Sequence, residues 1–171
     1  MLALAVVARM AGSGEVPWAA PDAPEWPVSP LRDLGLGLAV GAALVAAGRG
    51  LTEWLPRGDE AARSLARSLG PLSTADARLL AVASGLAEEA FFRGALLPWV
   101  GLWGAALLFG ALHFVPERAF WPWTAFAVVA GVAFGGHFLF TGHLLAPVTA
   151  HVLVNAVNLP WIVARYADAD R

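Results

Sequence analysis

The chain has 171 residues, of which 58% are hydrophobic and 14% are charged. Soluble domains average about 45–50% apolar and about 25% charged residues, so this composition excludes an ordinary soluble fold and predicts a polytopic membrane protein. The net charge of −2 offers no basic surface for nucleic acid, and the absence of cysteine excludes disulfides and thiolate metal ligands.

The N-terminal segment MLALAVVARMAG (residues 1–12) is apolar but shorter than a membrane span. Twelve helical residues rise about 18 Å, whereas the hydrocarbon core of a bilayer is about 30 Å thick. Arg9 and the small residues after it loosely resemble a processing signal, and a truncated first span fits the same sequence. The sequence therefore leaves both interpretations open.

A proline-rich linker follows at Ser13–Pro30 and prevents a continuous helix there. Trp18 and Trp26 in this linker are typical of a membrane interface. All of its charges are acidic, which indicates the non-cytoplasmic side of the membrane.

The next span is predicted at Leu31–Gly48, where Gly37 and Gly41 would let a neighbouring helix approach closely. The loop after it, Arg49–Arg78, contains five of the eleven basic residues, which marks it as cytoplasmic by the positive-inside rule. Within this loop, residues 59–70 (DEAARSLARSLG) fit a short amphipathic helix on the inner membrane surface. A solvated connector is the competing interpretation.

The helix after this loop is apolar yet carries Glu88, Glu89 and Arg93 at its centre. Ser73 is its expected N-cap and Pro98 its expected end. Each central charge costs about 2.5–3.5 kcal/mol in a membrane span, so each needs a partner. Glu89 and Arg93 are i and i+4 on one face and can pair, in a structural or a catalytic role. Glu88 lies about 100° away around the helix and needs a partner from elsewhere in the chain.

Three further spans are predicted at residues 99–115, 121–140 and 147–165. Pro160 is expected to kink or end the last of them. With the two earlier spans this makes five clear spans, in addition to the undecided segment at the N-terminus. Counting outward from the Arg-rich loop places both termini in the cytoplasm.

Three polar side chains in these later spans are candidate partners for Glu88: His113, His151 and Asn155. Intramembrane ionisable groups face the interior of a bundle, so the four side chains could converge on one wet pocket. His151 and Asn155, at i and i+4, could alternatively form a structural hydrogen-bonding pair between helices. His143 lies near a helix end and is interpreted as interfacial.

Such a pocket could activate water. A glutamate flanked by a histidine can hold a water molecule and take its proton, while a second histidine and a carboxamide can donate hydrogen bonds to an oxyanion. The same carboxylate and imidazoles, Glu88, His113 and His151, could instead bind a divalent metal such as zinc. The sequence leaves these two mechanisms open, and the first requires no cofactor.

Three motifs occur in order, each within an apolar helix: EExxxR at residues 88–93, FxxxH at 109–113 and HxxxN at 151–155. Together they resemble the motifs of the CAAX prenyl protease 2 (Rce1-type, Abi) family of intramembrane proteases, also described as the CPBP family. The resemblance covers roughly Ser73–Leu159.

The resemblance implies an all-α membrane bundle with its active site in a cavity inside the bilayer. It also assigns six side chains to three roles: activation of water by Glu88 and His113, stabilisation of the oxyanion by His151 and Asn155, and shaping and charge balance of the site by Glu89 and Arg93.

The predicted organisation has three parts: an N-terminal membrane region at 1–72, a catalytic helical core at 73–165 and a polar tail at 166–171. The leading hypothesis is an endopeptidase of a bacterial inner (plasma) membrane that cleaves a membrane-associated peptide or protein. The alternatives are a non-catalytic relative that acts in bacteriocin immunity or as an assembly partner, and a small transporter or proton relay.

Overall fold

The computed structural model describes residues 1–12, 18–20 and 29–166, and these form helices without any β-strand. This confirms the predicted all-α class. In chain order the elements are α1 (Leu2–Gly12), α2 (Pro30–Trp54), α3 (Pro56–Leu69), α4 (Thr74–Glu89), the π-helix η1 (Ala90–Leu96), α5 (Leu97–Leu112), the 3-10 helix η2 (Arg118–Phe120), α6 (Trp121–Thr141) and α7 (Leu145–Tyr166).

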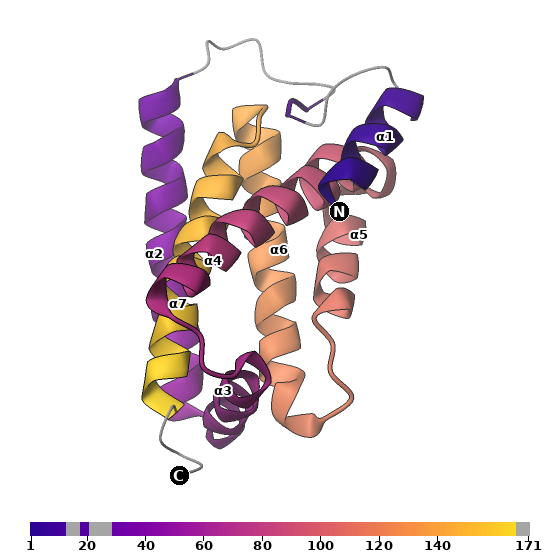
Figure 1. Ribbon diagram of the computed structural model, residues 1–171. Helices are drawn as coiled ribbons and strands as arrows, with labels where there is room; N and C mark the ends of the chain where they lie inside the picture. Colours follow the sequence, from indigo (N-terminus) through magenta and orange to yellow (C-terminus); the bar gives the residue numbers. More distant parts are fainter. Residues whose placement is uncertain (13–17, 21–28, 167–171) are drawn as a thin grey trace.

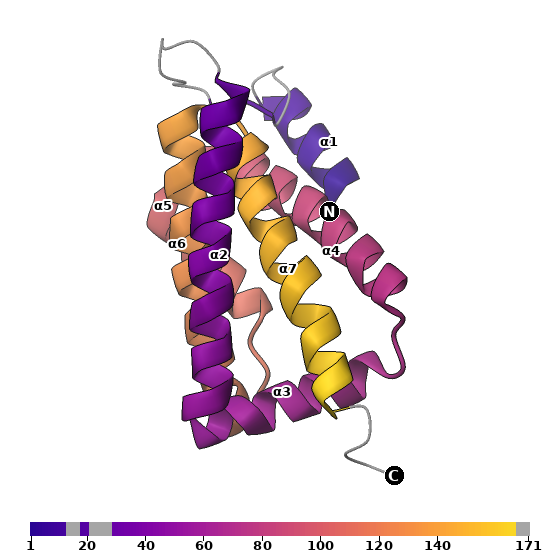
Figure 2. The same cartoon turned by 90° about the vertical axis from the view of Figure 1, so that its left-hand side faces the viewer.

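Helices α2, α6 and α7 run lengthwise through the molecule, while α4 and η1 cross them at a slant (Figure 1). Helix α2 packs along α7, and α3 lies across the end of the bundle at the last turns of α7 (Figure 2). Within the described residues, four helical segments are long and apolar enough to cross a membrane: Pro30–Trp54, Thr74–Leu112, Arg118–Thr141 and Leu145–Tyr166.

The expected five complete spans are reduced to four because two of them form one helical run, Thr74–Leu112. The chain bends at Gly101, not at Pro98, because Gly101 has a φ of 70° that favours glycine. Pro98 is tolerated in the first turn of α5, where a missing N–H matters least. The part of α5 after the bend rises only about 16 Å. It ends near half the height of α6 (Figure 1).

The close approach predicted for Gly37 and Gly41 is confirmed at the contact between α2 and α7. A Cβ atom on Gly37 would lie 2.6 Å from the carbonyl oxygen of Ala146, and one on Gly41 would lie 3.0 Å from that of Ala150. Both glycines are buried. Any larger residue would force the two helices apart, so these positions hold α7 and its polar side chains in place.

Both α2 and α7 extend beyond their predicted ends. Helix α2 continues to Trp54, so Arg49 belongs to the helix and not to the loop. Helix α7 begins at Leu145 and passes through Pro160 to Tyr166. A proline removes one helical hydrogen bond, and packing against a neighbouring element can outweigh that loss.

The helix predicted within residues 59–70 is present as α3, which begins at Pro56, while its place on the inner membrane surface stays a prediction. Its apolar face packs on the last turns of α7 through a cluster formed by Ala62, Ala66, Ile162 and Tyr166. This contact extends α7 past its proline and covers one end of the bundle. The expected N-cap of α4 is also confirmed, because Ser73 accepts a hydrogen bond from the backbone N–H of Asp76.

The undecided N-terminal segment forms the short helix α1, which packs against η1 and buries Ala5. It is not among the segments long enough to span a membrane. Most of the linker, including Trp26, lies outside the described residues, as does the polar tail beyond Tyr166.

Candidate active site

The predicted pairing of Glu89 with Arg93 is confirmed, and the pair is fully enclosed. Arg93 donates a hydrogen bond to Glu89 Oε1 at 2.9 Å, and the two side chains are 1% and 0% exposed. Arg93 donates a second hydrogen bond to the Gly131 carbonyl of α6 at 3.1 Å. Arg93 lies in the π-helix η1, a wider turn that is uncommon and often marks functional sites. The ion pair therefore joins α4 to η1, and the bond to Gly131 joins Arg93 to α6.

His151 is held by the same carboxylate. Its Nδ1 lies 2.7 Å from Glu89 Oε1, and the side chain is 5% exposed. Because the carboxylate paired with Arg93 only accepts hydrogen bonds, Nδ1 carries the proton of this bond. In the neutral ring, Nε2 then presents a lone pair to the cavity.

The His113 ring, at the end of α5, is also oriented by a hydrogen bond at its Nδ1 atom. It lies at the C-cap of α5, where its Nδ1 is 2.8 Å from the carbonyl oxygen of Phe109. A carbonyl can only accept, so Nδ1 is the donor and Nε2 again faces the cavity with a lone pair. The sequence predicts that His113 lies within a complete span at residues 99–115. In the structure α5 ends at Leu112, so His113 lies at the end of a short helix.

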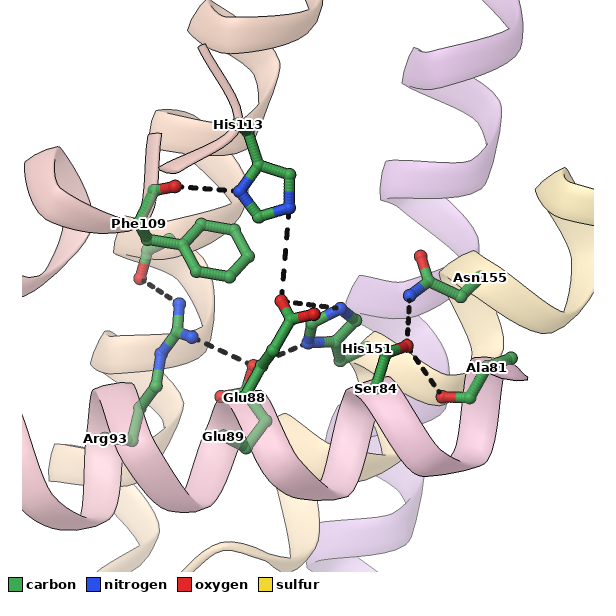
Figure 3. Close-up of polar contacts among 10 residues, drawn as sticks. Ala81, Ser84, Glu88, Glu89, Arg93, Phe109, His113, His151 and Asn155 are labelled. Carbon is green, nitrogen blue, oxygen red and sulfur yellow. Dashed lines mark hydrogen bonds and ion pairs between the residues drawn. The ribbon is translucent and has the colours of Figure 1, made fainter. Parts of the chain in front are cut away.

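Glu88 faces both imidazoles (Figure 3). Its Oε2 atom lies 4.0 Å from Nε2 of His113 and 4.0 Å from Nε2 of His151. Both separations are too long for direct hydrogen bonds, and Oε2 is buried without a hydrogen-bond partner among the described residues. The carboxylate and both ring nitrogens are acceptors, so a water molecule between them could donate to two of these three groups.

Asn155 lies one turn after His151 on α7 and contacts a residue that the sequence analysis did not identify. Its Nδ2 donates a hydrogen bond to Ser84 Oγ of α4 at 3.1 Å, and Ser84 donates to the Ala81 carbonyl at 3.3 Å. A serine in an apolar helix carries no distinctive signal, so only the packing of α4 against α7 reveals this contact.

Two phenylalanines complete the walls of the site. The Arg93 guanidinium lies 4.7 Å from the ring centre of Phe109 and 5.3 Å from that of Phe134. Phe134 also stacks on His151, with ring centres 5.1 Å apart. The F of the FxxxH motif thus shields the buried cation, while Phe134 belongs to no motif and was not predicted.

Glu88, His113, His151 and Asn155 line a cavity of about 200 Å³, which is the candidate active site and is called the catalytic pocket below. The structure brings together all four residues proposed from the sequence as catalytic. The residues of this pocket that carry polar side chains are Ser84, Glu88, His113, Trp123, His151 and Asn155.

The residues present do not fit a metal ion as they are placed. Glu88, His113 and His151 are suitable donor types, but zinc ligands at about 2.0–2.1 Å in tetrahedral geometry lie roughly 3.4 Å apart. The Glu88–histidine separations here are 4.0 Å. In the part of the chain that the structure describes, no three His, Cys, Asp or Glu side chains are grouped to hold a metal.

Fold and site define a helical membrane protein with a glutamate and two histidines that line a pocket between its helices. The sequence model of the Type II CAAX prenyl endopeptidase Rce1-like family matches residues 71–157, which include all three motifs. The chain belongs to this family and is an integral membrane protein.

A curated relative is the uncharacterized protein YpbD of Bacillus subtilis (strain 168). It is 30% identical over 135 residues, which cover 77% of this chain and 70% of YpbD. No solved structure matches this chain.

Proposed function

We propose that the protein is an intramembrane endopeptidase that hydrolyses a peptide bond of a membrane-associated peptide or protein. One observation carries this proposal: the Glu88 carboxylate lies 4.0 Å from Nε2 of two imidazole rings. Each ring is held in its orientation by a hydrogen bond at its Nδ1 atom. A buried structural carboxylate would be expected to contact its partners directly. This arrangement leaves space for the reactant water.

In the proposed mechanism, Glu88 takes a proton from the water while His113 helps to orient it. The water oxygen bonds to the carbonyl carbon of the substrate, and the carbonyl oxygen becomes negatively charged. The C–N bond then breaks, and Glu88 returns the proton to the leaving nitrogen. Atoms and charges balance with water as the only co-reactant, and no step requires a metal.

The developing oxyanion needs hydrogen-bond donors. Asn155 has two N–H groups on Nδ2, of which one is bonded to Ser84, so the second is available to the substrate. His151 can donate from Nε2 when both ring nitrogens are protonated, and its bond to Glu89 holds the ring in place for this contact. Glu89 and Arg93 serve in this scheme as positioning residues.

We further propose that the end of the bundle formed by α3 faces the cytoplasm of a bacterium, with the protein in the plasma membrane. The Arg-rich loop supports this orientation by the positive-inside rule. Figure 2 shows the last turn of α7, which ends at Tyr166, at the same end as α3, so α7 ends on the cytoplasmic side in this proposal. The N-terminus would share that side only if residues 1–12 crossed the membrane.

Comparative proteomics of membrane fractions tests the proposed activity. Cells that produce the wild-type protein should contain cleaved membrane peptides that are missing from cells producing Glu88→Ala at the same level. Identical peptide patterns in the two kinds of cells would contradict the proposed protease activity. If protection against a bacteriocin survived both Glu88→Ala and His113→Ala, the non-catalytic immunity function would replace it.

A further inference from the structure

Ser84 is the one polar contact of Asn155 that the structure gives among the described residues, and it lies on the same face of α4 as Glu88, four residues earlier. Figure 3 shows its hydroxyl between the Asn155 amide and the Ala81 carbonyl. Ser84 also lines the catalytic pocket. Its hydroxyl is therefore well placed to act on Asn155 without touching the reacting atoms.

The hydrogen bonds of Ser84 have a fixed direction. A hydroxyl has one proton, and the Ala81 carbonyl at 3.3 Å can only accept it. The Ser84 oxygen then offers only lone pairs to Asn155, so the amide must turn Nδ2 toward it, as the 3.1 Å contact shows. The two ends of a carboxamide are nearly equal in shape, so hydrogen bonding and not packing selects between them.

This selection matters for the chemistry. With Nδ2 directed toward Ser84, the amide retains a second N–H on the same nitrogen for the substrate. A flipped amide would place Oδ1 against the lone pairs of Ser84. It would also replace a donor with an acceptor near the negative charge that develops on the substrate.

We propose that Ser84 is a positioning residue that sets the orientation of the Asn155 amide so that an N–H group, not the carbonyl oxygen, meets the oxyanion. This inference rests on the proposed function. It assigns a role to a serine that lies outside the three motifs. It also explains why the polar side chain at this position of α4 faces the pocket and not the lipid.

The test uses purified full-length protein in dodecyl maltoside micelles, with a defined mixture of synthetic apolar peptides as the probe. The fastest cleaved peptide serves for kinetics. Ser84→Ala should lower kcat by about 2- to 10-fold, the equivalent of one hydrogen bond, with little change in KM. Ser84→Thr retains the hydroxyl and should keep kcat near the wild-type value.

A double-mutant cycle separates positioning from a general structural role. Ser84→Ala should have no further effect on kcat once Asn155→Ala is present, because the amide it orients is gone. Ser68→Ala is the matched control, since Ser68 donates a similar bond to the Ser64 carbonyl on exposed α3. This control should leave kcat unchanged.

Wild-type kcat in Ser84→Ala, or equal effects of Ser84→Ala with and without Asn155, would overturn the positioning role. A loss of folded protein with unchanged kcat per folded molecule would overturn it as well. Glu88→Gln in the same assay tests the proposed mechanism separately: full activity in that variant removes the role of Glu88 as the base, whatever Ser84→Ala does. No peptide cleavage by the wild type would remove both.

Discussion

Two histidine–carboxylate groups lie in different regions of this molecule, and their geometries differ. In the catalytic pocket, Glu88 is 4.0 Å from both histidine nitrogens that face it. At the opposite end of the bundle from α3, Asp33 of α2 makes direct contacts with its neighbours. His143 Nε2 lies 2.9 Å from Asp33 Oδ2, an ion-pair distance without the alignment of a hydrogen bond, and Arg32 donates to Asp33 Oδ1 at 2.8 Å.

The second group, Arg32, Asp33 and His143, is here called the closed cluster. It joins the start of α2 to the turn between α6 and α7, and its carboxylate is 0% exposed. A buried carboxylate with direct partners is the usual structural solution. The catalytic pocket differs from that solution at Glu88, where the gap to each histidine nitrogen is 4.0 Å and not 2.9 Å, and we propose that this gap serves chemistry rather than stability.

The largest loss of stability is expected when the ion pair between Glu89 and Arg93, beside the catalytic pocket, is broken. Arg93→Met leaves the Glu89 carboxylate buried without its cation, which should reduce the free energy of unfolding by about 3–5 kcal/mol. Thermal melting in detergent micelles measures this loss. Arg63→Met is the matched control, because Arg63 forms the same i,i+4 contact with Asp59 at 42% exposure and should cost less than about 1 kcal/mol.

Equal melting temperatures for Arg93→Met and Arg63→Met would contradict the account of the buried pair. The double variant Glu89→Gln with Arg93→Met should recover part of the lost stability, because it removes the unpaired charge.

A smaller effect is expected when the closed cluster is broken. Asp33→Asn keeps the shape of the side chain but removes its charge, so stability should fall by about 1–3 kcal/mol through weakened hydrogen bonds. The cleavage rate per folded molecule should stay at the wild-type value, since this cluster lies outside the catalytic pocket. A large fall in that rate, measured on protein matched for folded fraction, would show that the two regions are not independent.

The smallest change in stability is expected from the loss of a third carboxylate, that of Asp59 on α3, which is partly exposed. The Tyr166 hydroxyl, followed by Arg63, donates hydrogen bonds to it and lowers the pKa of this carboxyl below its ordinary value of 3.8. Asp59 therefore contributes stability that is fully present above that value and is lost as pH falls through the lowered pKa of the folded state.

The contribution should be less than about 1 kcal/mol, because solvent screens an exposed pair. The melting temperature of the wild-type protein should exceed that of Asp59→Asn at neutral pH, and the gap should narrow as the pH falls below 3.8. A gap that widened at acid pH would reverse the sign of this contribution.

Local spacing was sufficient to predict part of the site. The pairing of Glu89 with Arg93 depends only on their i,i+4 separation, and it left Glu88 without a partner inside its own helix. The high cost of polar groups in apolar helices then directed His113 and His151 toward the same interior. Their convergence on Glu88 follows from that cost.

Other features depend on tertiary packing and were not predictable from one sequence. The bend at Gly101 and the π-helix at Ala90–Leu96 change the path of the chain without a periodic signal. His143 is interpreted from the sequence as interfacial because it lies near a helix end, and only the folded chain brings it to Asp33. Ser84 and Phe134 likewise gain their roles from helices that pack against them.

The cleavage rate of purified Glu88→Gln, measured beside the wild type and Asp33→Asn on the same peptide, shows whether Glu88 is the base. Glutamine keeps the size of the side chain but cannot take a proton from water. The account predicts a rate at least about 100-fold below the wild type, with an unchanged melting temperature, while Asp33→Asn retains its rate. Cleavage by Glu88→Gln at the wild-type rate would contradict the assignment of Glu88 as the base.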